Sequence, residues 1–368
     1  MKIELDGGAL HDTLRAAIYK PRSTLPILSF ALLDAAGERV RITTTDTEAY
    51  FIADLPAKVP ANGRICVNIE LLRAAAREGR LALLHNDDSG IMQAAPKGGS
   101  KLRLPVLDAD DFPEPDHGNW KPLDVDGAEL ATALRLVGYA AGHNNAYAFA
   151  NLVALVPGAV AATDTHRAAK YTIAYNGPQI AIPEGQIDSV LAQLGPDAKL
   201  SYTSNAAGQA TMLRVENGER TLIVRLIAAE LPQYENVFTG IDQRDRRALF
   251  DRVKLLQAVK QFMPFTAVEG IPKASFKGAY LDVQAGGAKL EIFENEENCS
   301  WALSKHDGDI RFSLSMHYLA DVLSVIDTER VWIGHVKIAD QFDRLTIEPD
   351  IPGAEVLPHA HIIVGMTL

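Results

Sequence analysis

The sequence contains two cysteines, Cys66 and Cys299, among 368 residues. A small secreted scaffold stapled by disulfides needs many more. These two thiols also lie far apart along the chain, in its first and last thirds. We therefore interpret both as inert thiols in a reducing cytosol, and we expect a cytoplasmic protein.

Long apolar runs are also missing. No run approaches the roughly 18 residues that cross a bilayer, and Met1–Asp6 lacks the apolar centre of a signal peptide. Apolar residues make up 47% of the chain and charged residues 23%, which is ordinary for a globular protein. The sequence thus predicts no membrane segment, and its length indicates two or three domains.

Motifs for enzymatic chemistry and for bound cofactors are absent as well. The sequence has no Walker motif and no dinucleotide fingerprint. Asp164, Thr165 and His166 look like a hydrolase fragment, but catalytic triads are assembled in space rather than from adjacent residues, and no nucleophile elbow is present. We expect no enzyme, no catalytic residue and no cofactor.

Two groups of residues carry side chains that can bind metal ions. The acidic segment 108–116 does not have the spacing of a calcium loop and is interpreted as a linker. His359 and His361 alternate on a predicted strand and so share one face, but no cysteine or third histidine is close in sequence. No metal site is predicted.

Positive charge is in deficit, since the formal net charge is -11. This excludes a protein that grips nucleic acid over its whole surface. It does not exclude basic residues gathered on one face. The distribution of charge therefore matters more than the sum.

What the sequence does contain is a repeat of about 120 residues. Short motifs return at nearly constant spacing, which indicates one structural unit used three times. The period is too long for a solenoid, so each unit is expected to be a domain. The recurring motifs are Thr45–Thr47 and Thr163–Thr165 (118 residues apart), Asp111–Pro113 and Glu230–Pro232 (119), Leu14–Arg15 and Leu134–Arg135 (120), and Leu134 and Leu256 (122).

Hydrophobic periodicity predicts the same order of elements in each repeat. Two helices should cover one face of an antiparallel sheet, which gives an α+β fold. Helices are predicted from Leu10 to about Ile18 and over 68–78, 130–139, 186–194, 252–262 and 316–326. Strands are predicted over 27–33, 40–45, 102–104, 152–156, 160–163, 222–227, 279–283, 289–293 and 361–364, with a second linker at 231–240.

Several motifs carry a resemblance to a known family. They are Thr24–Leu28 (TLPIL), Asp111–Pro113 (DFP), Ala162–Arg167 (ATDTHR), Leu231–Tyr234 (LPQY) and Val364–Leu368 (VGMTL). In this order and spacing they resemble the β subunit of bacterial DNA polymerase III, the sliding clamp. The matches spread over the whole chain, and as a set they are specific.

The resemblance implies three clamp domains, 1–118, 119–243 and 244–368, arranged as a half-ring. Two protomers would close head to tail into a ring that encircles double-stranded DNA without reading its sequence. Such a ring tethers DNA polymerase and other DNA enzymes. A clamp loader opens and closes it with ATP, which the ring itself does not hydrolyse.

The resemblance also implies a pocket between the second and third domains that takes a short partner peptide with apolar and aromatic residues. Two departures predict an altered shape: Thr165 replaces a glycine, and Ala168 replaces a leucine and should leave a larger hollow. Matching positions are Phe149, Thr163, Thr165, His166, Arg167, Ala168, Ser315, Tyr318, Phe342, Arg344, Ile362, Ile363, Val364, Met366 and Leu368.

Basic residues on and near the helices are expected to face DNA, because phosphate contacts position a duplex without reading it. The acidic side chains of Glu184, Asp188, Asp321 and Asp327 should weaken this surface. The expected DNA-facing residues are Arg15, Lys20, Arg22, Arg73, Arg77, Arg80, Arg135, His143, Arg252, Lys254 and Lys260.

Joining the first domain of one protomer to the third domain of another would bury two exposed sheet edges. Leu102, Leu104, Phe262 and Phe265 are the apolar candidates for this seam in a homodimer, with ordinary domain core as the alternative for each. Two other functions stay open: a clamp-like scaffold that binds proteins and does not encircle DNA, and an enzyme built on duplicated domains.

Overall fold

The computed structural model describes residues 1–77, 79–86, 90–115, 118–239, 246–266, 279–285, 287–292, 298–301, 305–336, 343–354 and 357–365. The chain forms two compact units. Unit 1 contains Met1–Ala128 and Gln186–Ala228, and unit 2 contains Glu129–Gly185 and Ala229–Leu368. Each unit thus combines segments from more than one sequence repeat, and the division into three domains stays a prediction.

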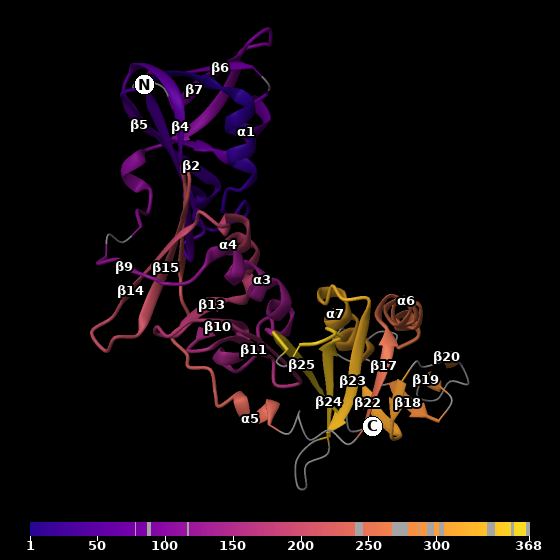
Figure 1. Cartoon of the computed structure of the whole chain (residues 1–368). Helices are drawn as coiled ribbons and strands as arrows, with labels where there is room; N and C mark the ends of the chain where they lie inside the picture. The colour runs from indigo at the N-terminus through magenta and orange to yellow at the C-terminus, as the bar shows by residue number, and fades with distance from the viewer. Residues whose placement is uncertain are drawn as a thin grey trace. The chain divides into compact units, whose positions relative to one another are not determined.

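Unit 1 holds a 12-stranded sheet with the strand order β1-β6-β7-β8-β5-β2-β3-β4-β16-β15-β14-β9 (Figure 1). Its helices are α1 (Gly7–Arg15), α2 (Ile69–Ala75) and α4 (Ile187–Gln193). Its strands are β1 (Lys2–Asp6), β2 (Phe30–Ala36), β3 (Arg39–Thr45), β4 (Ala49–Ala61), β5 (Gly63–Asn68), β6 (Arg80–His85), β7 (Ile91–Pro96), β8 (Leu102–Leu107), β9 (Lys121–Pro122), β14 (Lys199–Ser204), β15 (Ala210–Asn217) and β16 (Arg220–Arg225).

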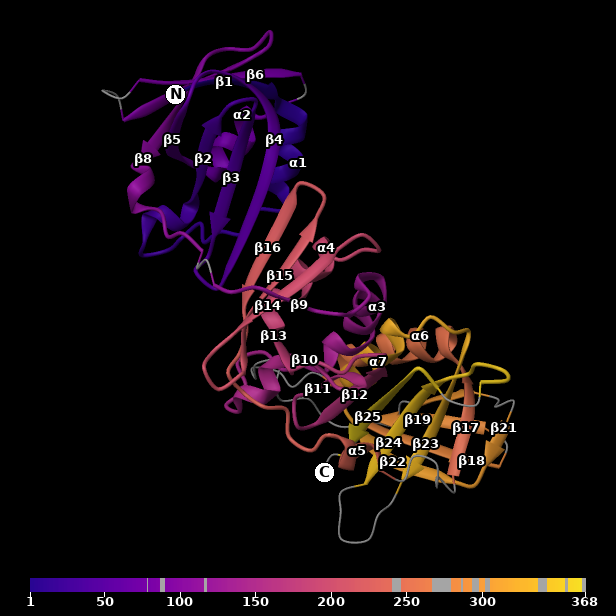
Figure 2. The same ribbon diagram turned by 60° about the vertical axis from the view of Figure 1, so that its left-hand side comes forward.

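Unit 2 holds a nine-stranded sheet, β13-β10-β11-β12-β25-β24-β23-β17-β21, and a four-stranded sheet, β20-β19-β18-β22 (Figure 2). Its helices are α3 (Gly127–Val137, whose first two residues belong to unit 1), α5 (Glu235–Phe238), α6 (Arg252–Phe262) and α7 (Met316–Val325). Its strands are β10 (Leu152–Val156), β11 (Ala159–Thr163), β12 (Arg167–Thr172), β13 (Ile180–Pro183), β17 (Arg246–Asp251), β18 (Ala279–Gln284), β19 (Gly287–Ile292), β20 (Asn298–Trp301), β21 (Lys305–Asp307), β22 (Ile310–Leu314), β23 (Arg330–Val336), β24 (Arg344–Pro349) and β25 (His359–Val364).

Every strand pairing in the described residues is antiparallel, which confirms the predicted α+β class. Among those same residues, no helix has the length and apolar character needed to cross a membrane.

Aspartates start equivalent helices in the two units. The Asp6 carboxylate accepts a hydrogen bond from the amide of Ala9 at 2.8 Å, and the Asp251 carboxylate accepts one from Lys254 at 3.0 Å. An N-cap of this kind satisfies an amide that has no partner inside the helix. The cap explains why α6 begins at the residue predicted from the sequence.

One predicted strand is wrong at its start. The segment Pro26–Ser29 forms a short 3₁₀ helix, and β2 begins only at Phe30. Pro26 occupies the first helical turn, where its fixed φ and missing N–H fit well. The apolar run from Ile27 to Leu33 suggested one continuous strand because periodicity cannot see this change of backbone.

Two strands continue the sheet across repeat boundaries. β4 follows the turn at Thr45–Thr47 and pairs with β16, whereas β12 follows the turn at Thr163–Thr165 and pairs with β25. In each case the partner is the last strand of the next repeat. The same turn therefore stands at both seams, as the sequence repeat predicts.

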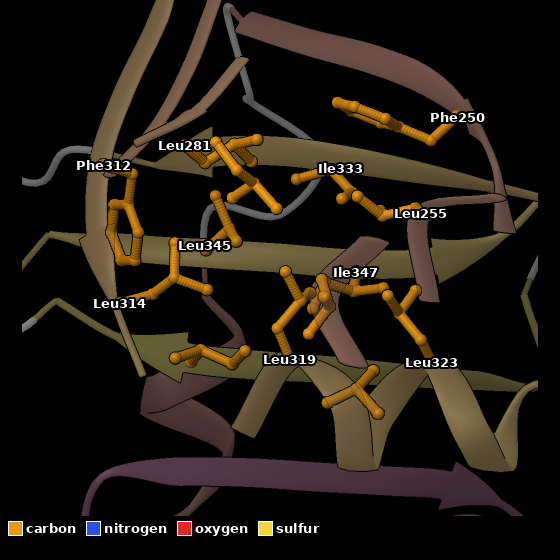
Figure 3. Packing of buried hydrophobic residues seen from close by; sticks show 14 of the residues in the cluster. Phe250, Leu255, Leu281, Phe312, Leu314, Leu319, Leu323, Ile333, Leu345 and Ile347 are labelled. Atoms are coloured by element: carbon orange, nitrogen blue, oxygen red, sulfur yellow. The ribbon is translucent and has the colours of Figure 1, made fainter. Parts of the chain in front are cut away.

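The core of unit 2 lies between helices α6 and α7 and the strands beside them. Figure 3 shows Leu319 and Leu323 of α7 pointing toward Ile347 of β24, with Leu255 of α6 on the same side. All four side chains are at most 1% exposed. The corresponding core of unit 1 packs α1 and α2 against their sheet, with Leu10, Leu14, Ile69 and Leu72 among its buried residues.

Cys66 on β5 lies in a smaller cluster of unit 1 with Phe30, Leu32, Ala109 and Phe112. Burial raises the pKa of its thiol to about 12. The thiol therefore stays protonated and unreactive at neutral pH. This agrees with the interpretation of Cys66 as a core residue, and the side chain of Cys299 lies outside the described residues.

Replacing Leu319 by alanine should lower the free energy of unfolding of unit 2 by about 2–5 kcal/mol, because a fully buried leucine leaves a cavity. The measurement is urea unfolding followed by the fluorescence of Trp332 in β23. Val253→Ala on α6, where the side chain is 46% exposed, is the matched control and should change stability by less than about 0.5 kcal/mol. Equal effects of the two substitutions would contradict the assignment of Leu319 to the core.

Candidate functional site

The turn between β11 and β12 is fixed by its own side chains. Thr163 Oγ1 donates to the carbonyl of Arg167 at 2.7 Å and accepts from the amide of Thr165 at 3.1 Å. Asp164 Oδ1 accepts from the amides of His166 and Arg167, both at 2.9 Å. In such turns, hydrogen bonds from short polar side chains to nearby backbone groups replace the backbone hydrogen bonds between paired strands.

Arg167 is the centre of the site. Its Nε donates to Asp164 Oδ2 at 2.9 Å and its Nη1 donates to Asp321 Oδ2 on α7. Burial opposes the charge of the guanidinium, but the two carboxylates outweigh it and raise the pKa of Arg167. The arginine is thus held in one orientation by its own turn and by Asp321, which lies 154 residues further along the chain.

Aromatic rings flank this arginine. Its guanidinium carbon lies 4.7 Å from the centroid of the Tyr318 ring and 5.3 Å from that of Tyr139. The exposed His166 ring lies nearly parallel to Tyr318, with centroids 6.3 Å apart. We call Tyr139, Asp164, His166, Arg167, Tyr318 and Asp321 the Arg167 cluster. It offers flat apolar surface beside fixed charge, which suits an aromatic or apolar guest.

The strand pairing β12–β25 separates the predicted pocket residues onto two faces. Paired residues share a face of the sheet, and neighbours alternate. Arg167 pairs with Ile363, which lies in the helix-side core, whereas Ala168 pairs with Ile362, which packs with Phe238 of α5 on the opposite face. Ile362 and Ile363 therefore lie on opposite faces of the sheet, and their shared membership of the pocket stays a prediction.

Arg344 has a structural role. Its Nη1 donates to the carbonyls of Asn236 and Val237 at 3.1 and 2.8 Å, and so fastens α5 to β24. Burial lowers the pKa of this guanidinium. Its contacts hold the outer-face helix rather than the Arg167 cluster.

The other predicted pocket residues are spread around these elements. Phe149 is half-buried and stacks on Tyr147, with centroids 5.5 Å apart. Ser315 is buried at the start of α7, and the amide of Val364 donates to the carbonyl of His166 at 2.8 Å. Phe342, Met366 and Leu368 lie outside the described residues.

Four of the predicted DNA-facing residues bind acidic groups or backbone in their own unit. Arg252 donates to the carbonyls of Thr328 at 2.6 Å and Leu323 at 2.9 Å, near the end of α7. Arg252 is half-buried and these bonds direct its guanidinium to the backbone at and beyond the end of α7, so it is a weaker candidate for contact with DNA. The other three contacts are Arg80 with Glu4 (2.7 Å), His143 with Glu184 (2.9 Å) and Lys254 with Asp251 (3.3 Å).

The remaining basic residues extend from helices or from the loops that follow them. Arg73 is half-buried, and the others are exposed. They are Arg15 on α1, Lys20 and Arg22 in the loop after it, Arg73 on α2, Arg77 just after α2, Arg135 on α3 and Lys260 on α6. These seven are the better candidates for phosphate contacts.

Burial divides the four residues predicted at a protomer seam. Leu104 and Phe262 are 3% and 8% exposed and belong to the cores of units 1 and 2. Leu102 on β8 and Phe265 after α6 are 40% and 49% exposed. The seam prediction therefore narrows to Leu102 and Phe265, because a side chain already packed in its own core has little surface left to offer.

No group of three or more potential metal-binding side chains is found in the described part of the chain. The acidic segment instead makes local contacts: Asp108 caps a 3₁₀ turn, and Glu114 pairs with Arg64. A hollow of about 340 Å³ does occur in unit 1, next to Trp120. Its charged residues already form ion pairs, such as Arg41 with Asp54 at 2.9 Å and Arg214 with Glu216 at 3.2 Å, so the hollow supports no ligand proposal.

Comparisons with known proteins point to bacterial beta sliding clamps. Residues 8–116 match the model of the DNA polymerase III beta subunit, N-terminal domain. A beta sliding clamp of Pseudomonas putida is 26% identical over 338 residues, which cover 86% of this chain and 88% of that protein. A beta sliding clamp of Caulobacter vibrioides is 31% identical over 121 residues.

The chain is thus similar to bacterial beta sliding clamps over most of its length. The crystal structure of the DNA polymerase III subunit beta from Pseudomonas aeruginosa superposes with a TM-score of 0.81 at 22% identity, and each chain is covered completely. The beta chain from Streptococcus pneumoniae gives a TM-score of 0.85 at 14% identity. The fold is therefore kept across the whole length while most side chains have changed.

Ala168, which replaces a leucine of the family motif, lies in a buried cluster, and the larger hollow expected there stays a prediction. It is 2% exposed and packs with Phe238, Ala360 and Ile362. Phe238 of α5 is itself 7% exposed, so Ala168 lies in a closed apolar cluster. Lys170 lies over the same ring, with its Nζ 5.2 Å from the centroid.

Thr165, which replaces a glycine of the family motif, carries backbone strain in this clamp. Its φ is +80°, in the left-handed region that β-branched residues rarely adopt. Thr47 in the equivalent turn has φ +79°. The positive φ explains why a glycine suits this position of the family motif.

Replacing Thr165 by glycine should raise the free energy of unfolding of unit 2 by about 1 kcal/mol, because glycine adopts positive φ without steric cost. Urea unfolding of the two proteins measures the change. Thr172→Gly at the end of β12, an exposed threonine of the same strand, should instead lower stability by about 0.5–1 kcal/mol. A loss of stability in Thr165→Gly would show that the turn is not strained.

Proposed function

We propose that this chain is a DNA polymerase processivity factor: a homodimeric ring that encircles duplex DNA and tethers DNA polymerase and clamp loader subunits through the Arg167 cluster. The role is one of binding, without a catalytic step of its own. The cytoplasm is the compartment in which such a ring meets bacterial DNA. The single observation that carries the proposal is the clamp fold over the full chain, repeated at two internal seams.

The two internal seams support a third seam between protomers. β4 follows β2 and β3, and β12 follows β10 and β11; each pairs with the last strand of the next repeat. β20 follows β18 and β19 and so holds the equivalent place in the third repeat. By the same pattern, it should pair with the last strand of another repeat. In the described residues β20 pairs only with β19, at the end of its sheet.

The matching last strand is β8 of the first repeat. Leu102 to Pro105 pair with β7 on one edge, and only Val106 and Leu107 pair with β5 on the other. The free edge of β8 would take β20 of a second protomer, beside the exposed Leu102. Two such head-to-tail contacts close a ring and leave neither edge exposed.

The exposed basic residues on helices of both units support a DNA-facing surface. Phosphate contacts from arginine and lysine are screened by salt and do not read sequence. Because Arg80, His143 and Lys254 already neighbour carboxylates, the direct affinity for open DNA should be weak. Retention would then depend on ring closure. Because these basic residues are paired with carboxylates, a scaffold that binds proteins without encircling DNA is the second candidate function.

A DNA retention assay separates the clamp from the scaffold. The dimer is dissociated by dilution, mixed with nicked circular plasmid and reconcentrated, so that it closes around DNA without a loader. Gel filtration should then recover protein with the plasmid, and a single restriction cut should release it. Leu102→Glu, which places a charge at the proposed seam, is the control that should not be retained.

Retention that survives the restriction cut would contradict topological binding. A protein shown to be dimeric that never elutes with the plasmid would favour the scaffold.

Peptide binding at the Arg167 cluster is tested by titrating a fluorescein-labelled peptide that carries the clamp-binding motif common to partners of this family. Tyr318→Ala should weaken binding about thirtyfold, because loss of an aromatic hot spot costs about 2 kcal/mol. Tyr202→Ala in unit 1 is the control and should bind as the unaltered protein does. No binding by a folded, dimeric protein would indicate a rewired site that serves dedicated partners.

A further inference from the structure

A series of hydrogen-bonded side chains leads from Tyr139 of the Arg167 cluster into the core of unit 2. The hydroxyl of Tyr139 lies 2.9 Å from His361 Nδ1, and His361 Nε2 lies 2.9 Å from His359 Nδ1. His361 is 0% exposed and His359 is 5% exposed. The histidines that the sequence placed on one face of β25 therefore bond to each other, and the tyrosine continues the line toward Arg167.

Donors and acceptors can be assigned consistently along the series Tyr139, His361 and His359. Burial lowers the pKa of His361 well below its usual value, and His359 adds to this; burial also lowers the pKa of His359, although Asp327 opposes the change. Both imidazoles are then neutral, and each has one donor and one acceptor. Tyr139 donates to His361 Nδ1, and His361 Nε2–H donates to His359 Nδ1. Every nitrogen between the two ends is satisfied.

The near end of this series touches the site. The Tyr139 ring lies 5.7 Å from the His361 ring and 5.3 Å from the guanidinium carbon of Arg167. Burial raises the pKa of the Tyr139 hydroxyl, so it stays a neutral donor. The Tyr139 side chain is therefore held by two contacts. His361 binds its hydroxyl, and the Arg167 guanidinium lies over the face of its ring.

We propose that Tyr139, fixed by His361 and His359, is a positioning residue that holds the Arg167 guanidinium against Tyr318 and thereby sets the affinity of the site for partner peptides. The affinity half of this inference rests on the proposed function. The positioning half concerns the unliganded protein and stands without it.

A simple packing role would make different demands. If Tyr139 only filled space, its hydroxyl would need no partner in line with a second histidine, and phenylalanine would serve equally well. Two histidines in the core are costly unless each nitrogen is bonded. Metal binding does not explain the two histidines, because His361 Nε2 and His359 Nδ1 are hydrogen-bonded to each other.

The test uses three substitutions in the full-length dimer and one matched control. Tyr139→Phe removes only the hydroxyl. His361→Phe removes its acceptor, whereas His361→Asn keeps an acceptor near the Nδ1 position. Tyr171→Phe is the control, because Tyr171 lies on the same strand as Arg167 and pairs with His359, but it is not part of the Arg167 cluster.

Two readouts are taken on each protein. The first is the NMR signal of the Arg167 Nε–H in protein labelled with ¹⁵N-arginine, which reports the hydrogen bond to Asp164 and the ring currents of both tyrosines. The second is the affinity for the fluorescein-labelled peptide. We expect Tyr139→Phe and His361→Phe to move the Arg167 signal and weaken the peptide about fivefold, the effect of one hydrogen bond.

His361→Asn should recover most of both effects, and Tyr171→Phe should show neither. An unchanged Arg167 signal in Tyr139→Phe would overturn the positioning role. A moved signal with unchanged peptide affinity would overturn the link to binding. If the unaltered protein binds no peptide, the proposed function fails at this site, and the Arg167 signal alone decides whether Tyr139 positions the arginine.

Discussion

The structure depends on a requirement of β-sheets: the outer edge of a strand must find a partner. In both units the strand that follows a Thr-Asp-Thr turn obtains that partner from the end of the next repeat. Each junction is thus made of backbone hydrogen bonds, which tolerate wide change in side chains. This explains how the fold superposes at a TM-score above 0.8 while identity falls to 14%.

The two internal seams share a turn but differ in chemistry. Thr45 and Asp46 bond to the backbone as Thr163 and Asp164 do, at 2.7–2.9 Å. The residue that starts the following strand, however, is Ala49 at the first seam and Arg167 at the second. Only the second position carries a guanidinium that reaches a carboxylate on α7 and two tyrosine rings. The backbone builds two equivalent places, and one side chain makes them different.

Much of the fold followed from local sequence signals. The repeat period placed Thr45–Thr47 and Thr163–Thr165 at equivalent positions, and the caps at Asp6 and Asp251 set where α1 and α6 begin. The predicted strand at Ile27 began too early because Pro26 favours a helical turn, which hydrophobic periodicity does not register. Local signals succeed where residues close in sequence decide the structure.

The site was harder to predict because its contacts join residues far apart. Motif matching located Arg167 and Tyr318, but it could not separate Ile362 from Ile363, which point to opposite faces. The packing of Ala168 against Phe238 of α5 joins residues 70 positions apart, which no local motif reveals. Tyr139 was missed altogether. Its signal was present only as a tyrosine in one repeat and a pair of histidines 220 and 222 residues later.

The pairing of β12 with β25 also has a consequence in time. Tyr171 pairs with His359, which the ribosome adds 188 residues later. At about 5–20 residues per second, the edge of β12 waits on the order of 10–40 s before its partner exists. During that interval a nascent chain presents an unpaired strand to the crowded surroundings of the ribosome. That interval is the period in which shielding of the β12 edge would protect the nascent chain from pairing with another strand.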